Sequence, residues 1–143
     1  MANSKIGIVW AVIETRFHAK CRLEGEVAEF CHHTTLQYGV EKTDFAAYIG
    51  RSFKAKVLAE CWDETIGAQA LKVELQPEIA AICKNKWPHV TIFTRQGVEA
   101  LMSNTMLDGP HHEAPAAVAE LTMRIEFCPL EEIPSQEVSI RQK

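Results

Sequence analysis

The stretch KNKWPHVTIFT, residues 84–94, decides how the rest of the chain is interpreted. From His89 onward it is a run of β-branched, aliphatic and aromatic residues, which is typical of a buried strand. Pro88 directly precedes this run and opens the predicted strand, a position where proline is tolerated. A histidine that begins such a strand is a packed core residue, a ligand or a catalyst. The stretch alone does not decide among these three roles.

The same local pattern occurs a second time. The segments HTTL and HVTI, which begin at His33 and His89, both have the order His-x-Thr-aliphatic. Residues two apart on a strand share a face, so His33 and Thr35 point the same way, and so do His89 and Thr91. One copy is a weak indication of catalysis, because threonine is common in strands. Two copies favour a site in which neighbouring strands present two imidazoles and two hydroxyls together.

Two imidazoles and two hydroxyls are the groups needed to hydrolyse a strained phosphodiester without a metal ion. A neutral histidine takes a proton from water, and a protonated one gives a proton to the departing ribose oxygen. The ordinary histidine pKa of about 6.5 puts both forms within reach near neutral pH. Threonine hydroxyls can donate hydrogen bonds to the non-bridging phosphate oxygens. In this arrangement either histidine can be the acid or the base.

The paired motif resembles the signature of the two-histidine (LigT-like) phosphoesterase superfamily. Within it, the motif is most similar to the cyclic phosphodiesterase domain of plant and fungal tRNA ligases. The resemblance rests on HHTTLQYG, which begins at His32, and on NKWPHVTIFTRQGVEALMSNTML, residues 85–107. The first predicted strand resembles that of the family only in its apolar character. Met123 stands where the family often has a glycine. The ligase and kinase domains of the full enzymes are not recognised in this sequence, so a free-standing version is expected.

The resemblance implies an α+β fold with two lobes, each of which contributes one His-x-Thr strand to a central groove. It implies the opening of 2′,3′-cyclic phosphates of RNA ends or nucleotides, with a 2′-phosphate as product and without a metal or cofactor. Carried over residue by residue, it makes His33 and His89 the catalytic acid–base pair and Thr35 and Thr91 the phosphate-binding residues.

The substrate stays open at this point. A lone small domain can act instead on cyclic nucleotide or cyclic oligonucleotide second messengers, because the superfamily includes such enzymes and their in-line chemistry is similar. A catalytically idle module that binds RNA ends or nucleotides is a third alternative. The intact histidines and threonines argue against that module, since a binder does not need both proton-transfer groups. No obligatory protein partner is evident.

Four further residues are candidates for the site. By parity Gln37 and Phe93 continue the two catalytic faces and can touch a ribose or base, although edge packing is an equal alternative. Trp10 is a candidate to stack on a base, with a core position as the favoured alternative. His32 also begins a His-x-Thr, but strand alternation puts it on the opposite face. His33 is preferred, because only its motif is followed directly by an aliphatic residue.

The pair His111-His112 lies in a loop that contains glycine and proline. It resembles a metal-binding patch only superficially, and a solvated loop is the favoured alternative. The five cysteines are scattered and form no CxxC pair, which favours free thiols over a zinc knuckle or a disulfide framework. No metal site is therefore expected.

Length and charge exclude some classes of protein. A chain of 143 residues can bury a core as one domain. The net charge of −4 argues against a non-specific coat on nucleic acid, but not against one nucleotide in a pocket. The apolar run from Ile6 to Ile13 is too short to span a bilayer and lacks the architecture of a signal peptide. We expect a cytoplasmic protein without a membrane partner.

The order of predicted elements favours an α+β fold over a doubly wound parallel sheet, because strands and short helices do not alternate regularly. With the resemblance, this predicts a single domain over residues 1–143, with two mainly antiparallel sheets around a central groove and short flanking helices. Strands are predicted at 5–14, 29–40, 88–94 and 120–130, and a hairpin at 54–75. Helical segments are predicted at 44–50 and 96–107, a short helical turn or a loop at 76–86, and a loop at 108–117.

Overall fold

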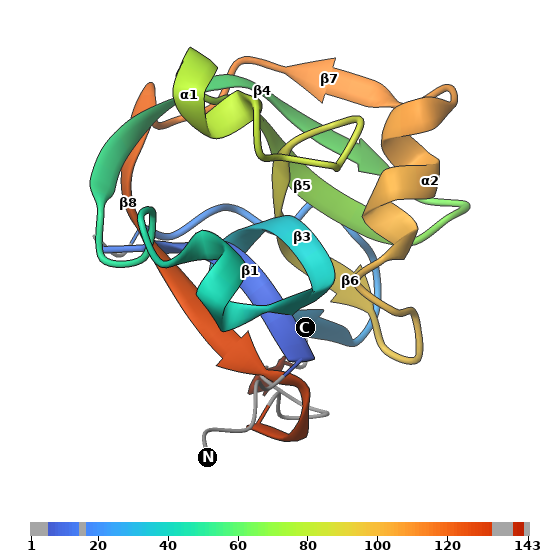
Figure 1. Ribbon diagram of the computed structural model, residues 1–143. Helices are drawn as coiled ribbons and strands as arrows, with labels where there is room; N and C mark the ends of the chain where they lie inside the picture. Colours follow the sequence, from blue (N-terminus) through green and yellow to red (C-terminus); the bar gives the residue numbers. More distant parts are fainter. Residues whose placement is uncertain (1–5, 15–16, 133–138, 142–143) are drawn as a thin grey trace.

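Strands make up most of the regular secondary structure, and short helices lie between them (Figure 1). This computed structural model describes residues 6–14, 17–132 and 139–141. The strands are β1 (Ile6–Ile13), β2 (Val27–Glu29), β3 (His33–Glu41), β4 (Ser52–Asp63), β5 (Ala68–Glu74), β6 (His89–Arg95), β7 (His112–Ala114), β8 (Glu120–Pro129) and β9 (Ser139–Arg141). The helices are α1 (Pro77–Ala80) and α2 (Met102–Asp108), with 3-10 turns η1 (Lys42–Phe45) and η2 (Leu130–Glu132).

The described strands form one antiparallel sheet in the order β3-β1-β8-β4-β5-β6-β2-β9, with β7 paired to β4. The predicted α+β class with antiparallel pairing is therefore confirmed. The expectation of two separate sheets is wrong, because β4 is 12 residues long and belongs to both halves. Residues 52–56 of β4 pair with β8, and residues 56–63 pair with β5.

The segment before β3 brings two distant strands of this sheet together. The backbone N–H of Cys31 donates to the carbonyl of Thr91 on β6, at 2.8 Å. The N–H of Ile13 on β1 donates to the carbonyl of His32, at 2.9 Å. The segment thus lies between β1 and β6, and β3 contacts β6 although the two are far apart in the strand order.

One main apolar core runs through both halves of the sheet. The apolar run of β1 fits its place between β3 and β8, because Val9 and Ala11 are fully buried and Trp10 is only 6% exposed. Burying each large aliphatic side chain contributes about 1.5–3 kcal/mol to stability. The largest fully buried side chains are Phe93, Leu23, Leu36, Leu71, Ile79, Ile92, Met106, Met123 and Ile125; of these, Met106 belongs to a second cluster.

The second, smaller cluster fixes α2 against the sheet. Met106 and Leu107 of α2 pack there on short side chains from β4 and β5. Because these side chains are short, the helix can lie close to β4 and to β5, the strand that pairs with β6. The small residues of this surface are Ala59, Cys61, Ala68 and Ala70.

Most predicted elements are confirmed. The hairpin at 54–75 is β4–β5, the strand at 88–94 is β6, and the strand at 120–130 is β8. The apolar run at 5–14 is β1 over its described residues, and the helical turn at 76–86 contains α1. In each case the local pattern agrees with the tertiary packing.

Other predicted elements differ from the structure. The helix predicted at 44–50 is only the turn η1, which has no side-chain cap. The helix predicted at 96–107 begins only at Met102, and the loop predicted at 108–117 contains β7. The strand predicted at 29–40 begins at His33 and ends at Glu41. β2 and β9 carry no sequence signal, because three-residue strands are too short to show alternation.

The structure describes all five cysteines. No disulfide joins Cys21, Cys31, Cys61 or Cys83. Cys61 is buried, and the other four are partly exposed. Within the described part of the chain, no helix is long and apolar enough to cross a membrane.

Candidate active site

β3 presents His33 and Thr35 on one face, as the alternation predicts. Both residues are half-buried, whereas Thr34 and Leu36 point the other way and are 0% and 1% exposed. β1 sets the register, with Trp10 directly opposite Thr35. Because directly opposed residues share a face, Trp10 lies on the same surface as the first His-x-Thr motif.

β6 carries the second motif in the same manner over its first four residues. Val90 and Ile92 are fully buried in the main core. Thr91 is half-buried, and His89 is 8% exposed. The aliphatic residues of the motif therefore anchor the strand, and the polar pair lies on the other face.

The structure brings the two motifs together. β3 contacts β6, and the segment that leads into β3 is hydrogen-bonded to Thr91. The charge of His89 is one of the causes that lower the pKa of His33, so the two rings lie within electrostatic reach. The catalytic and phosphate-binding roles of these four residues remain predictions, but their juxtaposition is a property of the fold.

His33 lies in a cluster of packed rings. Its ring centroid is 4.1 Å from that of Trp10, and its Nδ1 is 3.0 Å from Nδ1 of His32. Burial is the main cause that lowers the pKa of His33 to about 3, and the charges of His32 and His89 add to it. His33 is therefore a neutral imidazole near pH 7 in the free protein.

His32 does not lie where strand alternation predicts. Cys31 has a left-handed backbone with φ 54°, and the regular strand begins only at His33, so the two-residue repeat does not extend back to His32. Its half-buried ring instead lies edge-on to Trp10, with centroids 5.2 Å apart, and contacts His33. Burial lowers the pKa of His32, and the negative charge of Glu126 opposes this. His32 is thus a direct neighbour of the predicted catalyst.

The backbone sets the tautomer of His89. Its Nδ1 lies 2.6 Å from the carbonyl oxygen of Trp87, and a carbonyl can only accept, so Nδ1–H donates. The neutral ring then has its lone pair on Nε2, where it can take a proton. Burial lowers the pKa of His89, and the bond to the Trp87 carbonyl opposes this. His89 is therefore oriented and held in its basic form.

Thr91 has a partner that the sequence did not indicate. Its hydroxyl lies 2.9 Å from the hydroxyl of Ser103 on α2, and it donates to the carbonyl of Ala100 at 3.5 Å. A single serine on a later helix carries no pattern that links it to a strand, and only the packing of α2 shows the contact. Ser103 is fully buried, so its position is determined by the fold.

Gln37 stays on the half-buried side of β3, but its side chain is engaged. Its amide donates to the carbonyl of Ile82 at 3.0 Å, which ties β3 to the turn after α1. The amide can therefore reach a substrate only by giving up this bond, and positioning of the strand is its visible role.

Phe93 does not face the site, so the parity prediction for this residue is wrong. Its side chain is 0% exposed and belongs to the main core. Ala70 of β5 stands opposite Thr91, and the preceding Gln69 stands opposite Phe93. Ile92 is thus an extra residue in β6, and such a bulge reverses the alternation beyond it.

Trp10 occupies the core position that was its favoured alternative. At 6% exposure it has almost no ring surface for a base. Its ring packs instead on His32 and His33. The candidate role of Trp10 as a base-stacking residue is therefore not supported. Its contacts with His32 and His33 instead make it a packing support for these two rings.

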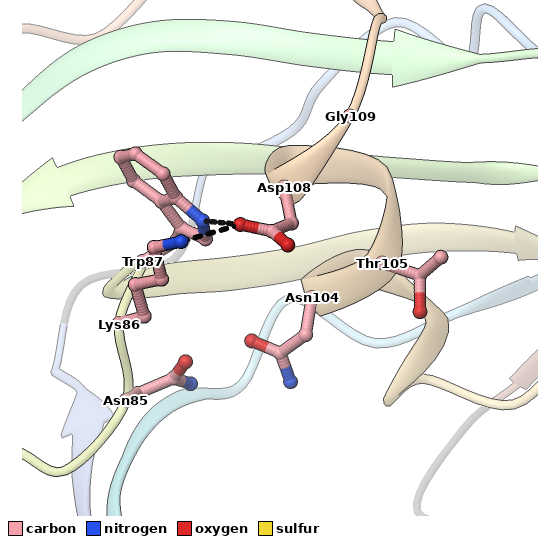
Figure 2. Close-up of a pocket in the computed structure, with 7 residues that line it drawn as sticks. All are labelled: Asn85, Lys86, Trp87, Asn104, Thr105, Asp108 and Gly109. Atoms are coloured by element: carbon pink, nitrogen blue, oxygen red, sulfur yellow. Dashed lines mark hydrogen bonds and ion pairs between the residues drawn. The ribbon is translucent and has the colours of Figure 1, made fainter.

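A pocket of about 470 Å³ adjoins the second motif. Figure 2 shows Asn85 and Asn104 with their amides toward the same open space, while Trp87 and Asp108 form another part of its wall. The Asp108 carboxylate accepts hydrogen bonds from the Trp87 indole at 3.0 Å and from Lys86 at 2.8 Å. Hydrogen bonds from Lys86, then from Trp87, lower the pKa of Asp108. Trp87 links the pocket to β6, because its side chain lines the pocket and its carbonyl accepts the hydrogen bond from His89.

Acid should destabilise the protein through its buried histidines. The pKa values of His33 and His89 lie below 6.5 in the fold, so the unfolded chain binds more protons once the pH falls below about 6.5. Stability should then decline toward pH 3, by up to about 1.4 kcal/mol per pH unit for each histidine. Urea unfolding between about pH 7 and pH 5 measures this decline. His33→Gln should make it shallower, and an unchanged slope would show that His33 is not held neutral.

Comparisons of this chain with protein-family models, with curated proteins and with solved structures found no match. The assignment of a function therefore rests on the residues and geometry of the site itself.

Proposed function

We propose that the protein is a metal-independent 2′,3′-cyclic phosphodiesterase that opens the cyclic phosphates of RNA ends or nucleotides. The observation that carries the proposal is the meeting of two His-x-Thr motifs, at His33 and His89, from strands that are distant in the sequence. The proposal includes the two-lobed arrangement of the two-histidine superfamily, with β3-β1-β8 in one lobe and β4-β5-β6 in the other. The thiols of Cys21, Cys31, Cys61 and Cys83 fit a reducing compartment such as the cytoplasm.

The reaction needs one proton removed and one delivered. A neutral histidine takes a proton from water, and the water oxygen forms a bond to phosphorus. The bond from phosphorus to the ribose O3′ breaks, and the second histidine gives its proton to that oxygen, which leaves a 2′-phosphate. Burial favours the neutral form of both histidines in the free protein. A bound phosphate anion favours the charged form of one of them, because opposite charges raise a histidine pKa.

Thr91 is suited to bind the phosphate. When Ser103 donates to the Thr91 oxygen, the Thr91 hydrogen can turn from the Ala100 carbonyl, 3.5 Å away, to a phosphate oxygen. A hydroxyl fixed in this way stabilises the negative charge that builds on the phosphate in the transition state. Thr35 has the corresponding place on β3, on the same face as His33.

The pocket beside Trp87 supports a nucleotide substrate. Its volume of about 470 Å³ falls within the usual range for small-molecule sites. Asn85 and Asn104 line it, and their amides can both donate to and accept from the edge of a base. A base in this pocket would lie next to the strand that carries His89.

A substrate panel tests the proposal. The protein is incubated with EDTA and, separately, with 2′,3′-cyclic nucleotides, oligonucleotides that end in a cyclic phosphate, 3′,5′-cyclic nucleotides and cyclic oligonucleotides. We expect turnover of the first two classes and a 2′-phosphate product. Turnover confined to the last two classes would indicate an enzyme that degrades cyclic second messengers. Binding without any turnover would indicate a catalytically idle binding module. Both of these results would overturn the proposal.

The pH dependence of kcat/KM should be bell-shaped with its maximum below about 6.5. One histidine must be neutral and the other charged, and kcat/KM reports the pKa values of the free enzyme. Because the pKa values of both His33 and His89 are lowered, the centre of the bell moves toward acid. Initial rates at low substrate concentration measure it, with circular dichroism to confirm folding at each pH. A maximum above pH 7 would contradict this assignment.

A further inference from the structure

Three side chains of the kinds that bind transition metals meet on β4 and β7, outside the two-histidine site. Cys61 of β4 stands directly opposite Glu113 of β7, so both point to the same face. His111 lies just before β7, and one ligand atom from each of the three residues lies within 4.8 Å of the other two. Cys61 is fully buried, the side chain of His111 is 11% exposed, and the Glu113 carboxylate opens to solvent.

His111 is held in the way that metal-binding imidazoles are held. Its Nδ1 lies 2.8 Å from the carbonyl oxygen of Gly109, so Nδ1–H donates and the neutral ring has its lone pair on Nε2. Nε2 lies 2.8 Å from Oε2 of Glu113, which as a carboxylate oxygen can only accept. Two acceptors at this distance repel each other unless a proton or a cation lies between them. The expectation of a solvated loop is therefore wrong for His111.

We propose that Cys61 Sγ, His111 Nε2 and the Glu113 carboxylate bind one zinc ion, with a fourth position open to water. Three protein ligands and one open position form a common zinc geometry, and the Gly109 carbonyl supplies the outer partner that orients the imidazole. A thiolate and an imidazole favour zinc over magnesium or calcium. On binding, the S–H bond of Cys61 breaks, a sulfur–zinc bond forms and the proton passes to solvent.

Lys72 competes with a metal ion for the Glu113 carboxylate, and this competition provides a specific test. Its Nζ lies 2.9 Å from Oε2 of Glu113. The carboxylate has lone pairs for both Lys72 and a metal, but two cations on one carboxylate repel each other. Lys72→Met should therefore tighten zinc binding. A weak surface patch that does not use Glu113 would not respond in this way.

A bound ion would connect this site to the pocket described above. It would tie β7 and the turn that contains His111 to β4. That turn follows α2 directly, and Asp108 and Gly109 at the end of α2 line the pocket. The zinc ion would thus fix one wall of the pocket and take no part in the proton transfers at His33 and His89.

Metal titrations test the site. Protein freed of metal by EDTA and desalting is titrated with Zn²⁺ by calorimetry, and with Co²⁺ by absorption. We expect one zinc per chain, and a cobalt spectrum with the visible bands of tetrahedral coordination and a thiolate charge-transfer band. Cys61→Ala and His111→Ala should each weaken zinc binding by about 100-fold or more. Zinc should raise the melting temperature of the wild type but not of these variants.

Matched variants make the test specific. His112→Ala removes the adjacent, exposed histidine, and Cys83→Ala removes a thiol elsewhere, so both should bind zinc like the wild type. Glu113→Gln changes an exposed position and gives a second measurement if a change at the buried Cys61 impairs folding. Absence of zinc binding by the wild type, unchanged binding after Cys61→Ala and Glu113→Gln, or an equal loss in His112→Ala would each overturn the proposal.

Discussion

His89→Ala is expected to lower kcat/KM on a 2′,3′-cyclic phosphate by about 10²–10⁴, and His33→Ala by a similar factor. Each change removes one of the two groups that move a proton in the proposed reaction. Because both act in the same step, the double variant should be little worse than either single variant. Initial rates at substrate concentrations below KM measure these effects. Loss of turnover in both single variants would support the proposed acid–base pair.

The controls separate chemistry from folding. His89 is buried, so the variants are compared with the wild type by circular dichroism and thermal melting, and His89→Gln serves as a larger replacement without the imidazole. His18→Ala removes an exposed histidine and should leave kcat/KM unchanged. His32→Ala should have a much smaller effect than His33→Ala, because His32 acts on His33 only by contact. Turnover that survives both His33→Ala and His89→Ala would contradict the proposed function.

Phe93→Ala should lower the free energy of unfolding by about 3–5 kcal/mol. The side chain is fully buried in the main core, so its removal loses apolar burial and leaves a cavity. Urea unfolding at neutral pH measures the change, and Phe93→Leu gives a smaller, measurable loss if the alanine variant does not fold. The kcat/KM of the folded fraction should change little, because the ring does not touch the site.

Tyr38→Ala is the matched control for this loss. Tyr38 is also an aromatic residue on a motif strand, but it is 68% exposed. Its replacement should change stability by no more than about 0.5 kcal/mol. If Phe93→Ala instead left stability intact and raised KM, the ring would face the substrate and the bulge at Ile92 would be absent from the protein in solution.

The repeated His-x-Thr pattern was enough to predict the local geometry of the site. Alternation places His33 with Thr35, and His89 with Thr91, and burial of the aliphatic partners Leu36 and Ile92 follows from the same rule. These relations involve residues at most three apart on one strand. They hold because a strand has a period of two over any stretch that stays regular.

The same rule fails where the strand is irregular. The left-handed backbone at Cys31 turns His32 toward His33, and the bulge at Ile92 turns Phe93 into the core. Neither irregularity follows from the residues beside it. Each is set by the strand or loop that pairs there, which is distant in the sequence, so a local pattern could not predict it.

The sequence by itself therefore determined the chemical groups of the candidate site, the strands that carry them and the antiparallel α+β class. Only the tertiary structure decided that β4 joins the strands into one sheet, that β3 meets β6, and that Ser103 holds Thr91. It also brought Cys61 of β4 next to His111 and Glu113, which lie at β7. The physical reason is that side-chain direction along a strand is a local property. Which strands pair, and in which register, depends on the burial of apolar surface across the whole chain.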